Sequence, residues 1–371
     1  MVASYQTLKV SPIYREKQVW YITPIWKKVS WNEIAYNHVK HLKKYLNITL
    51  LDEEAFPNLT IFSNPLIILH PYFYPLQKWE KRIKRNLIKL RGLIGIDVAD
   101  SDHLTNYAVR LTNYSKAIIV PSQKAKETYQ RSGVTRDVYV VPHGVSTEWI
   151  TTKPNEDPLL SQIAKLKETK NLKMILSFCI HSGYRKGIDL IAKIFAEVHK
   201  EIPNTALVLR DCYGIDVWTN PPTLRMLEVR AGASLTITKN WFSQNQKMLL
   251  FDLADVFLLG SRGGGFEHPA LEAIARGIPT IGAEGGAWED YMPKWMLVPS
   301  HKSQQVLAGN PIHDGCGVEM EIHKAVEKTI EFLTDKEYKQ KTKDYVKNVI
   351  EKNFTWEKIA LKLKNIITRY L

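Results

Sequence analysis

The sequence predicts an α/β protein built from two doubly wound domains, each with a parallel sheet between layers of helices. Short apolar runs alternate with longer amphipathic runs along the chain, which is typical of βαβ units. The length of 371 residues suits two domains. A polar break at 151–158 interrupts the alternation, which then restarts. We therefore expect domains at 1–152 and 153–352, followed by a terminal helical segment at 353–371.

In the first half, brief apolar runs predict buried strands, and the amphipathic stretches between them predict helices. The expected strands cover 19–23, 48–51, 66–69, 117–120 and 138–141. We expect helices over 32–46 and 123–131, and Ser122 is a suitable N-cap for the second one.

The second half repeats the pattern, with strands expected at 174–178, 205–209, 256–259 and 280–281. Helices are expected at 188–200, 269–276, 321–333, 336–352 and 356–371, and another is expected to end at 249–253. Ligands of open α/β sheets bind beyond the carboxyl ends of the strands. We therefore expect the chemistry in the crevice between the domains, on loops that follow strands.

The formal net charge of +13 favours anionic partners. The alternative is that the charge only keeps the protein soluble. Zinc-finger, helix-turn-helix and RNP patterns are missing, so no specific nucleic acid is expected as a partner. The three cysteines form no CxxC pair, which argues against a disulfide framework and a structural zinc. Without a secretory signal or an apolar run of about 18 residues, we expect a cytoplasmic protein.

Segment 77–91 holds seven basic residues and one acidic residue, and its apolar side chains fall on one helical face. This pattern is typical of a helix that lies on an anionic membrane. A surface helix that packs on its own domain by the same face is the alternative.

The stretch 255–280 carries most of the chemical information. Its expected strand runs into Gly263, Gly264 and Gly265, whose small size lets the backbone approach a ligand. Pro269 then opens a helix, and the free amides at the start of a helix favour phosphate oxygens. Glu272, further along this helix, can accept both hydroxyls of a ribose. The alternative is an ordinary glycine loop with a solvated Glu272.

This stretch resembles the sugar-nucleotide site of the family-4 retaining glycosyltransferases, which have the GT-B fold. Their pattern is Ser-x-x-Glu-Gly-Phe-Gly-x-Pro-x-Leu-Glu-Ala-x-Ala-x-Gly-x-Pro. The chain matches it at Ser261, Gly265, Phe266, Pro269, Leu271, Glu272, Ala273, Ala275, Gly277 and Pro279.

The resemblance implies that Glu272 binds the ribose and that the amides of 266–268, including His268, meet the sugar and diphosphate. Gly264, Gly265 and Leu271 are expected beside the donor as well. The pattern's first glutamate falls on Gly264, and we expect Glu267 to reach the sugar hydroxyls in its place.

A second match covers 182–189. Lys186 falls on the lysine with which the family holds the donor diphosphate, and His181 stands where its arginine usually lies. We expect Arg185 to take over the role of that arginine. Cations here would stabilise the leaving nucleoside diphosphate. Arg210, directly after the expected strand 205–209, is included among the donor-binding residues.

Weaker matches extend the resemblance over about 115–371. They are the strand ends at 118–122 and 138–145, where His143 and Gly144 are expected to line the cleft, the loop 284–289, and 354–356 before the last helix. In this fold the terminal helix crosses back to the first domain. The first hundred residues match poorly, and 24–32 replaces the family's glycine-rich loop on the acceptor side.

Segment 95–103 gathers three aspartates and a histidine after an apolar strand. Asp97 or His103 could orient the acceptor hydroxyl during transfer. A helix cap formed by Ser101 or Asp102 is an equal alternative, and a metal site is a lesser one.

Taken together, the sequence predicts a retaining, hexosyltransferase-type enzyme that uses a UDP- or GDP-sugar, with no cofactor and no metal. The acceptor is a glycan, a lipid or another hydroxyl compound. The alternatives are an epimerase, a phosphorylase, or a non-catalytic protein that binds a sugar nucleotide, since a fold does not fix a function.

Overall fold

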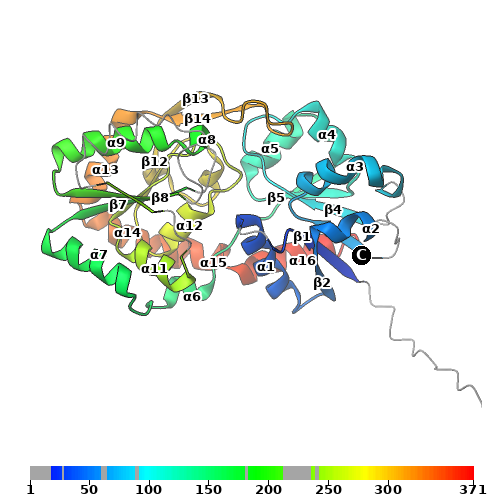
Figure 1. Ribbon diagram of the computed structural model, residues 1–371, viewed down its shortest axis with the longest axis horizontal. Helices are drawn as coiled ribbons and strands as arrows, with labels where there is room; N and C mark the ends of the chain where they lie inside the picture. Colours follow the sequence, from blue (N-terminus) through cyan, green and yellow to red (C-terminus); the bar gives the residue numbers. More distant parts are fainter. Residues whose placement is uncertain are drawn as a thin grey trace, which may run out of the picture.

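A computed structural model of the chain describes residues 18–26, 29–59, 65–87, 92–179, 183–211, 235–238 and 242–371. Its two lobes each contain a six-stranded parallel sheet (Figure 1). The first sheet has the order β2-β1-β3-β4-β5-β6. Its strands are β1 Val19–Thr23, β2 Ile48–Asp52, β3 Leu66–Leu69, β4 Gly92–Ile96, β5 Ala117–Val120 and β6 Asp137–Val140.

Helices cover both faces of the first sheet, because its strands are apolar on both sides. On one face, the helices α3 (Phe73–Leu87), α4 (Asn106–Thr112) and α5 (Gln123–Arg131) share a hydrophobic cluster with the sheet. On the other face, α1 (Ser30–Leu42) and α16 (Trp356–Ile367) complete a second cluster. The short α2 is Phe56–Leu59.

The second sheet has the order β12-β11-β10-β7-β8-β9. Its strands are β7 Lys173–Cys179, β8 Thr205–Asp211, β9 Leu235–Thr238, β10 Val256–Leu258, β11 Thr280–Ala283 and β12 Leu297–Val298. The helices of this half are α6 Thr147–Thr151, α7 Pro158–Thr169, α8 Gly183–Lys186, α9 Ile188–Glu201, α11 Gln244–Asp252, α12 His268–Ala275, α13 Ile322–Thr334, α14 Glu337–Tyr345 and α15 Glu351–Asn353.

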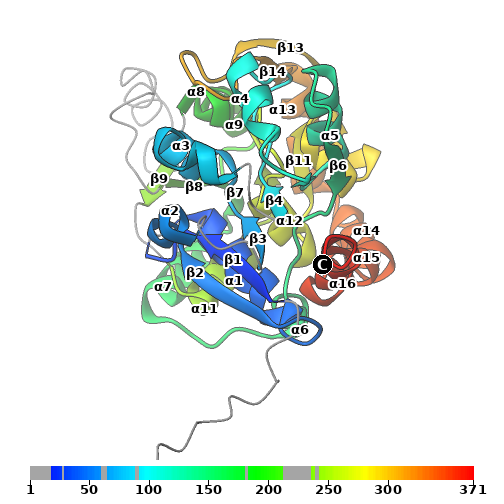
Figure 2. The same ribbon diagram turned by 90° about the vertical axis from the view of Figure 1, so that its right-hand side faces the viewer.

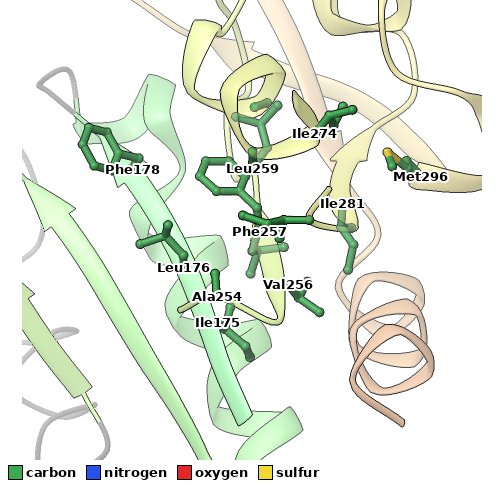
Figure 3. Close-up of a cluster of buried hydrophobic side chains, with 14 of the residues drawn as sticks. Ile175, Leu176, Phe178, Ala254, Val256, Phe257, Leu259, Ile274, Ile281 and Met296 are labelled. Atoms are coloured by element: carbon green, nitrogen blue, oxygen red, sulfur yellow. The ribbon is translucent and has the colours of Figure 1, made fainter. Parts of the chain in front are cut away.

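The core of this sheet forms where β7 and β10 pair. Figure 3 shows apolar side chains of both strands gathered with Ile274 of α12 and Ile281 of β11. Gly277, in a left-handed conformation, ends α12 as the sequence predicted. The predicted fold class of two Rossmann-like domains is confirmed, and we propose 1–152, 153–352 and 353–371 as the limits of its parts.

The C-terminal helix crosses back to the first lobe, as expected (Figures 1 and 2). Trp356, Ile359 and Leu363 of α16 are buried against the first sheet together with residues of α1. The chain therefore passes twice between the lobes at one place, where Val145 N donates to Phe354 O at 2.8 Å and Trp356 N donates to Val145 O at 3.1 Å.

A hairpin that was not predicted joins the lobes a second time. Strands β13 (Ser300–Gln305) and β14 (Cys316–Met320) leave the second lobe and reach the first one (Figure 1). At the tip, Thr105 N donates to Ile312 O at 3.0 Å, and Asp102 N donates to Cys316 O at 2.8 Å. Ile312 is buried in the hydrophobic cluster of the first lobe. We call this hairpin, residues 300–320, the strap.

The basic segment 77–91 falls largely in α3, whose apolar face packs on its own domain through Leu76, Ile83 and Leu87. This is the second of the two arrangements that the sequence allowed, and residues 88–91 lie outside the described part. In the part of the chain that the structure describes, no helix is long and apolar enough to cross a bilayer.

Candidate functional site

A cavity of about 150 Å³ lies between the lobes, where the strand order of each sheet changes direction. In the second sheet this point lies between β7 and β10, and in the first between β1 and β3, the positions at which α/β folds bind ligands. The first half of the chain contributes Val29, Ser30, Trp31, Ile34, Val98, Asp100 and His143, and the second contributes Phe178, Arg185, Lys186 and residues 265–269. The segment expected on the acceptor side, 24–32, thus reaches the cavity.

The three glycines after β10 serve contacts within the protein that a side chain would prevent. A Cβ atom at Gly263 would overlap Asp100 O, and one at Gly265 would overlap Val98. These two glycines therefore let the loop after β4 of the first lobe lie directly on the glycine loop of the second. The close approach of this loop to a ligand stays a prediction, whereas its close approach to a neighbouring protein loop is present in the structure.

Gly264 makes room for the carboxylate of Glu267. A Cβ atom at Gly264 would overlap Glu267 Oε1, so position 264 has no space for a side chain. The family pattern has glutamate at the position of Gly264 and glycine at that of Glu267, which means that the two residue types have exchanged places. Glu267 keeps a left-handed backbone with φ 61° and ψ 65°, a conformation that suits glycine.

Lys186 and Glu267 form a buried ion pair. Lys186 Nζ donates to the two carboxylate oxygens of Glu267 at 2.6 and 2.7 Å, and Arg185 NH1 lies 3.9 Å from Glu267 Oε1. The structure therefore brings together three of the residues that the sequence singled out.

Asp100 of the first lobe contacts Arg185 of the second. Arg185 NH1 donates to Asp100 Oδ1 at 3.2 Å and to Gly263 O at 3.0 Å. Burial alone would raise the pKa of Asp100, but the nearby charge of Arg185, aided by Lys186, lowers it below the ordinary value. Asp100 is thus an anion that faces the cation expected to meet a phosphate.

Glu272 lies one turn inside α12, and its carboxylate is almost entirely buried. Lys247 Nζ donates to Glu272 Oε1 at 2.6 Å, and His268 Nδ1 lies 3.7 Å from the same oxygen. The other oxygen, Oε2, is buried and has no hydrogen-bond partner among the described residues. Because an unpartnered buried carboxylate oxygen is costly, this atom is suited to accept a ligand hydroxyl.

Lys247 extends the site toward β8. Burial alone would lower its pKa, but the charges of Glu272 and Glu33 raise it above the usual value. The guanidinium of Arg210 lies 4.6 Å from the Phe178 ring centroid, and Lys247 Nζ lies 5.5 Å from it. The structure therefore places Arg210 beside the cavity wall. His181, the other donor-binding residue expected here, lies outside the described residues.

His143, which follows the last strand of the first sheet, lines the cavity with its buried imidazole. The ring of His143 lies 4.8 Å from that of Phe266, and burial, followed by the charge of His268, holds its pKa well below the usual range. His268 Nε2 donates to Gly144 O at 2.7 Å. A Cβ atom at Gly144 would lie 2.9 Å from Trp356 N, so this glycine allows the last helix to pass.

The structure does not bring Asp97 and His103 to the cavity. Asp97 is buried behind it and accepts from Phe73 N and Val98 N, both at 2.8 Å. His103 Nδ1 lies 2.7 Å from Asp314 Oδ1 of the strap, and the His103 side chain is 51% exposed. In the described part of the chain, no three His, Cys, Asp or Glu side chains are grouped to hold a metal.

Three residues at this site were missed by the sequence reasoning, namely Asp100, Lys247 and Glu33. Asp100 stands in the noted acidic cluster, but the sequence does not reveal that it faces Arg185. Glu33 Oε1 accepts from Gln244 Nε2 at 3.1 Å, across the lobes. No motif marks Lys247, which reaches Glu272 from another helix of the same lobe, or Glu33, whose contact depends on how the two lobes meet.

A family model described as "Family 4 Glycosyltransferase in conflict systems" matches residues 134–363. An uncharacterized protein, 356, of Sulfolobus islandicus rod-shaped virus 1 is 32% identical over 367 residues, 96% of this chain and 99% of that protein. A protein of Sulfolobus islandicus filamentous virus (isolate Iceland/Hveragerdi), provisionally named glycosyltransferase 45, is 26% identical over 251 residues, 65% of this chain and 64% of its own.

Solved structures share the fold at low identity. Anabaena HepE in complex with UDP-glucose superposes with a TM-score of 0.68 at 13% identity, covering 95% of this chain and 99% of that one. Sucrose-phosphate synthase from Thermosynechococcus elongatus superposes with a TM-score of 0.69 at 14% identity, with the same coverage of 95% and 99%. The chain therefore belongs to the family 4 glycosyltransferases, and it is a glycosyltransferase with the GT-B fold.

Proposed function

We propose that the enzyme transfers a hexose from a UDP-sugar to an acceptor hydroxyl with retention of the anomeric configuration. One observation carries the proposal. The cations Arg185 and Lys186, the buried carboxylate Glu267 and the start of α12 surround a single cavity between the lobes, and the buried carboxylate Glu272 lies one turn further along the same helix. The complexes of Anabaena HepE with UDP and with UDP-glucose favour uracil as the base.

The contacts of each residue suggest its role toward the donor. Glu272 holds the ribose, because its Oε2 is buried and has no hydrogen-bond partner in the described part of the chain. Arg185 and Lys186 hold the diphosphate, and both are now bonded to carboxylates that occupy the place of an anion. Glu267, released from Lys186 by the diphosphate, accepts hydroxyls of the sugar.

During transfer, the bond between the anomeric carbon and the diphosphate oxygen breaks, and a bond from the acceptor oxygen to the same carbon forms on the same face. The proton of the acceptor hydroxyl passes to the departing phosphate oxygen, and UDP leaves. Arg185 and Lys186 stabilise the negative charge that grows on the phosphate. Closure of the lobes keeps water from competing with the acceptor.

Binding of nucleotide sugars tests the donor site. We expect UDP and UDP-glucose to raise the melting temperature, and GDP to do so less. Glu272→Ala should weaken UDP binding about 10-fold or more, because a buried hydrogen bond between a charged group and a hydroxyl contributes about 1.5–3 kcal/mol. Glu319→Ala is a matched control, since Glu319 pairs with Arg262 and is not part of the cavity wall. Equal losses in both variants would contradict the assignment.

Analysis of products separates the enzymatic alternatives. Incubation of UDP-glucose with an acceptor panel should release UDP and form a glycoside, whose anomeric configuration is read by NMR. An altered sugar nucleotide without acceptor would indicate an epimerase. Sugar phosphate formed from inorganic phosphate would indicate a phosphorylase. Tight UDP binding without turnover on any acceptor would leave a nucleotide-sugar-binding protein.

A further inference from the structure

The strap and the crossing of α16 join the lobes at different places. In both views the strap passes between the lobes at the upper edge, and α16 lies well below it (Figures 1 and 2). The cavity between the lobes extends from His143, two residues before the crossing at Val145, to Asp100, which precedes the loop that the strap contacts. A hinge at Val145 alone would let the lobes swing apart, whereas the strap holds them together at the other end of the cavity.

The tip of the strap is bonded to the loop after β4. Gly315 N donates to Ser101 Oγ at 3.2 Å, and Cys316 N donates to Asp102 Oδ1 at 2.7 Å. Ile312 adds an apolar contact, because it is buried in the hydrophobic cluster of the first lobe. Water can replace the polar contacts at little net cost, so the burial of Ile312 is the main resistance to release of the tip.

The base of the strap is bonded to the opposite wall of the cavity. Val318 N donates to Arg262 O at 2.7 Å, directly before the glycine loop. A Cβ atom at Gly317 would overlap Arg262 O, so the strap lies closely on this part of the second lobe. The strap therefore links the loop after β4 to the glycine loop, and both loops line the cavity.

The cavity is too small for a nucleotide sugar while these two loops touch. It measures about 150 Å³, whereas pockets for small molecules run from roughly 300 to 1,000 Å³. Arg185, which is expected to meet the diphosphate, is bonded across the lobes to Asp100, and a Cβ atom at Gly263 would overlap Asp100 O. A donor can therefore enter only after the loop after β4 and the glycine loop have moved apart.

From these contacts we infer that the strap is an autoinhibitory clasp. Its tip holds the two loops together while Asp100 occupies Arg185, and the tip must leave the loop after β4 before a nucleotide sugar can enter. The inference rests on the proposed function for the identity of the ligand. Release of the tip thus becomes a step of donor binding, and the clasped protein is the state that does not bind the donor.

A disulfide across the tip tests whether the clasp must open. Leu104 and His313 form an antiparallel β-bridge, and Cα atoms in such pairs lie about 4.5–5.5 Å apart, within reach of a disulfide. The variant Leu104→Cys with His313→Cys is made together with Cys316→Ser, which removes the native thiol of the strap. We expect UDP to associate about 10-fold or more slowly with the oxidised protein than with the same protein after reduction. Stopped-flow tryptophan fluorescence measures the rate, since Trp31 lines the cavity.

Ile312→Asp tests the opposite change, because a buried carboxylate at this position should free the tip. UDP should associate about 10-fold or more quickly than with the parent, and the radius of gyration from small-angle X-ray scattering should increase. Gln304→Asp is the matched control, because it places the same side chain at an exposed position of the strap and should change neither quantity. Circular dichroism checks that both variants are folded, and the disulfide test stands if Ile312→Asp does not fold.

Equal association rates before and after reduction of the disulfide would overturn the inference, because the donor would then enter past a closed clasp. Equal effects of Ile312→Asp and Gln304→Asp would overturn it as well. If neither the parent nor any variant binds UDP, the proposed function fails instead. A larger radius of gyration of Ile312→Asp than of Gln304→Asp would then still support a clasp between the lobes, and equal radii would overturn the clasp too.

Discussion

The exchange of residue types between positions 264 and 267 can be reversed by mutation. Glu267→Gly removes the carboxylate that lies 2.6 and 2.7 Å from Lys186 Nζ. A hydrogen bond to a charged group contributes about 1.5–3 kcal/mol, so a lost contact to the sugar lowers kcat/KM about 10- to 150-fold. Glycine at this position relieves backbone strain, because a residue other than glycine in the left-handed conformation costs about 1–2 kcal/mol. Lys186 loses its partner at a buried place, and this loss outweighs the backbone gain, so we expect low activity and reduced stability.

The double variant Gly264→Glu with Glu267→Gly supplies the carboxylate from position 264 instead of position 267. Removal of the Glu267 side chain vacates the space that a side chain at 264 needs, because a Cβ atom there now overlaps Glu267 Oε1. The double variant should recover activity to within about 5-fold of the parent, by the reasoning of a double-mutant cycle. Gly264→Glu alone should be poorly active and less stable, since it crowds two carboxylates together.

Release of UDP from UDP-glucose, followed by chromatography, measures activity in all four proteins, and thermal unfolding measures their stability. The reasoning is refuted if the double variant is no more active than Glu267→Gly alone. In that case a carboxylate at this place is not what transfer requires.

Three further predictions concern residues around the cavity. Asp100→Asn should tighten UDP binding about 3- to 10-fold by calorimetry, because the diphosphate no longer competes with a carboxylate for Arg185; weaker binding would mean that Asp100 orients Arg185 instead. Burial, aided by the charge of Asp100, raises the pKa of Asp97 to about 7, so the folded state binds this proton more tightly and stability falls as pH rises from about 4 to 7. The stability of the parent relative to Asp97→Asn should therefore drop by about 2–3 kcal/mol between pH 5 and 8 in denaturant titrations, and a pH-independent difference would contradict this. His103→Ala should change UDP release less than about 2-fold, because His103 pairs with Asp314 away from the cavity; a large loss would restore the acceptor role.

Most regular elements could be predicted because local pattern and tertiary packing agree in them. The expected strands at 19–23, 66–69 and 117–120 coincide with β1, β3 and β5, whose side chains are buried on both faces. Ser122 caps α5 as expected, with its side chain accepting from Ala125 N. The strap was missed because its strand β13 is mostly polar and exposed, and because the far end of the hairpin is held by contacts with the first lobe.

The candidate site was predictable where one short segment carries it. Gly265, Glu267 and Lys186 line one cavity, and their roles toward a donor stay predictions. Asp97 was named as a site residue, but Asp100, three residues later, is the aspartate that lines the cavity. The sequence shows three aspartates after a strand, Asp97, Asp100 and Asp102, but only the turn of the loop decides which one faces Arg185.

The strap has a consequence for attempts to divide the protein. Ile312 lies in the hydrophobic cluster of the first lobe, although its hairpin springs from the second, and α16 lies beneath the first sheet. If the chain were cut at the polar break near residue 152, the strap and α16 would both go with the C-terminal fragment. Apolar surface would then be exposed on each of the two fragments. Neither fragment should be soluble when it is expressed alone, whereas the two fragments should associate and purify as one complex when they are co-expressed.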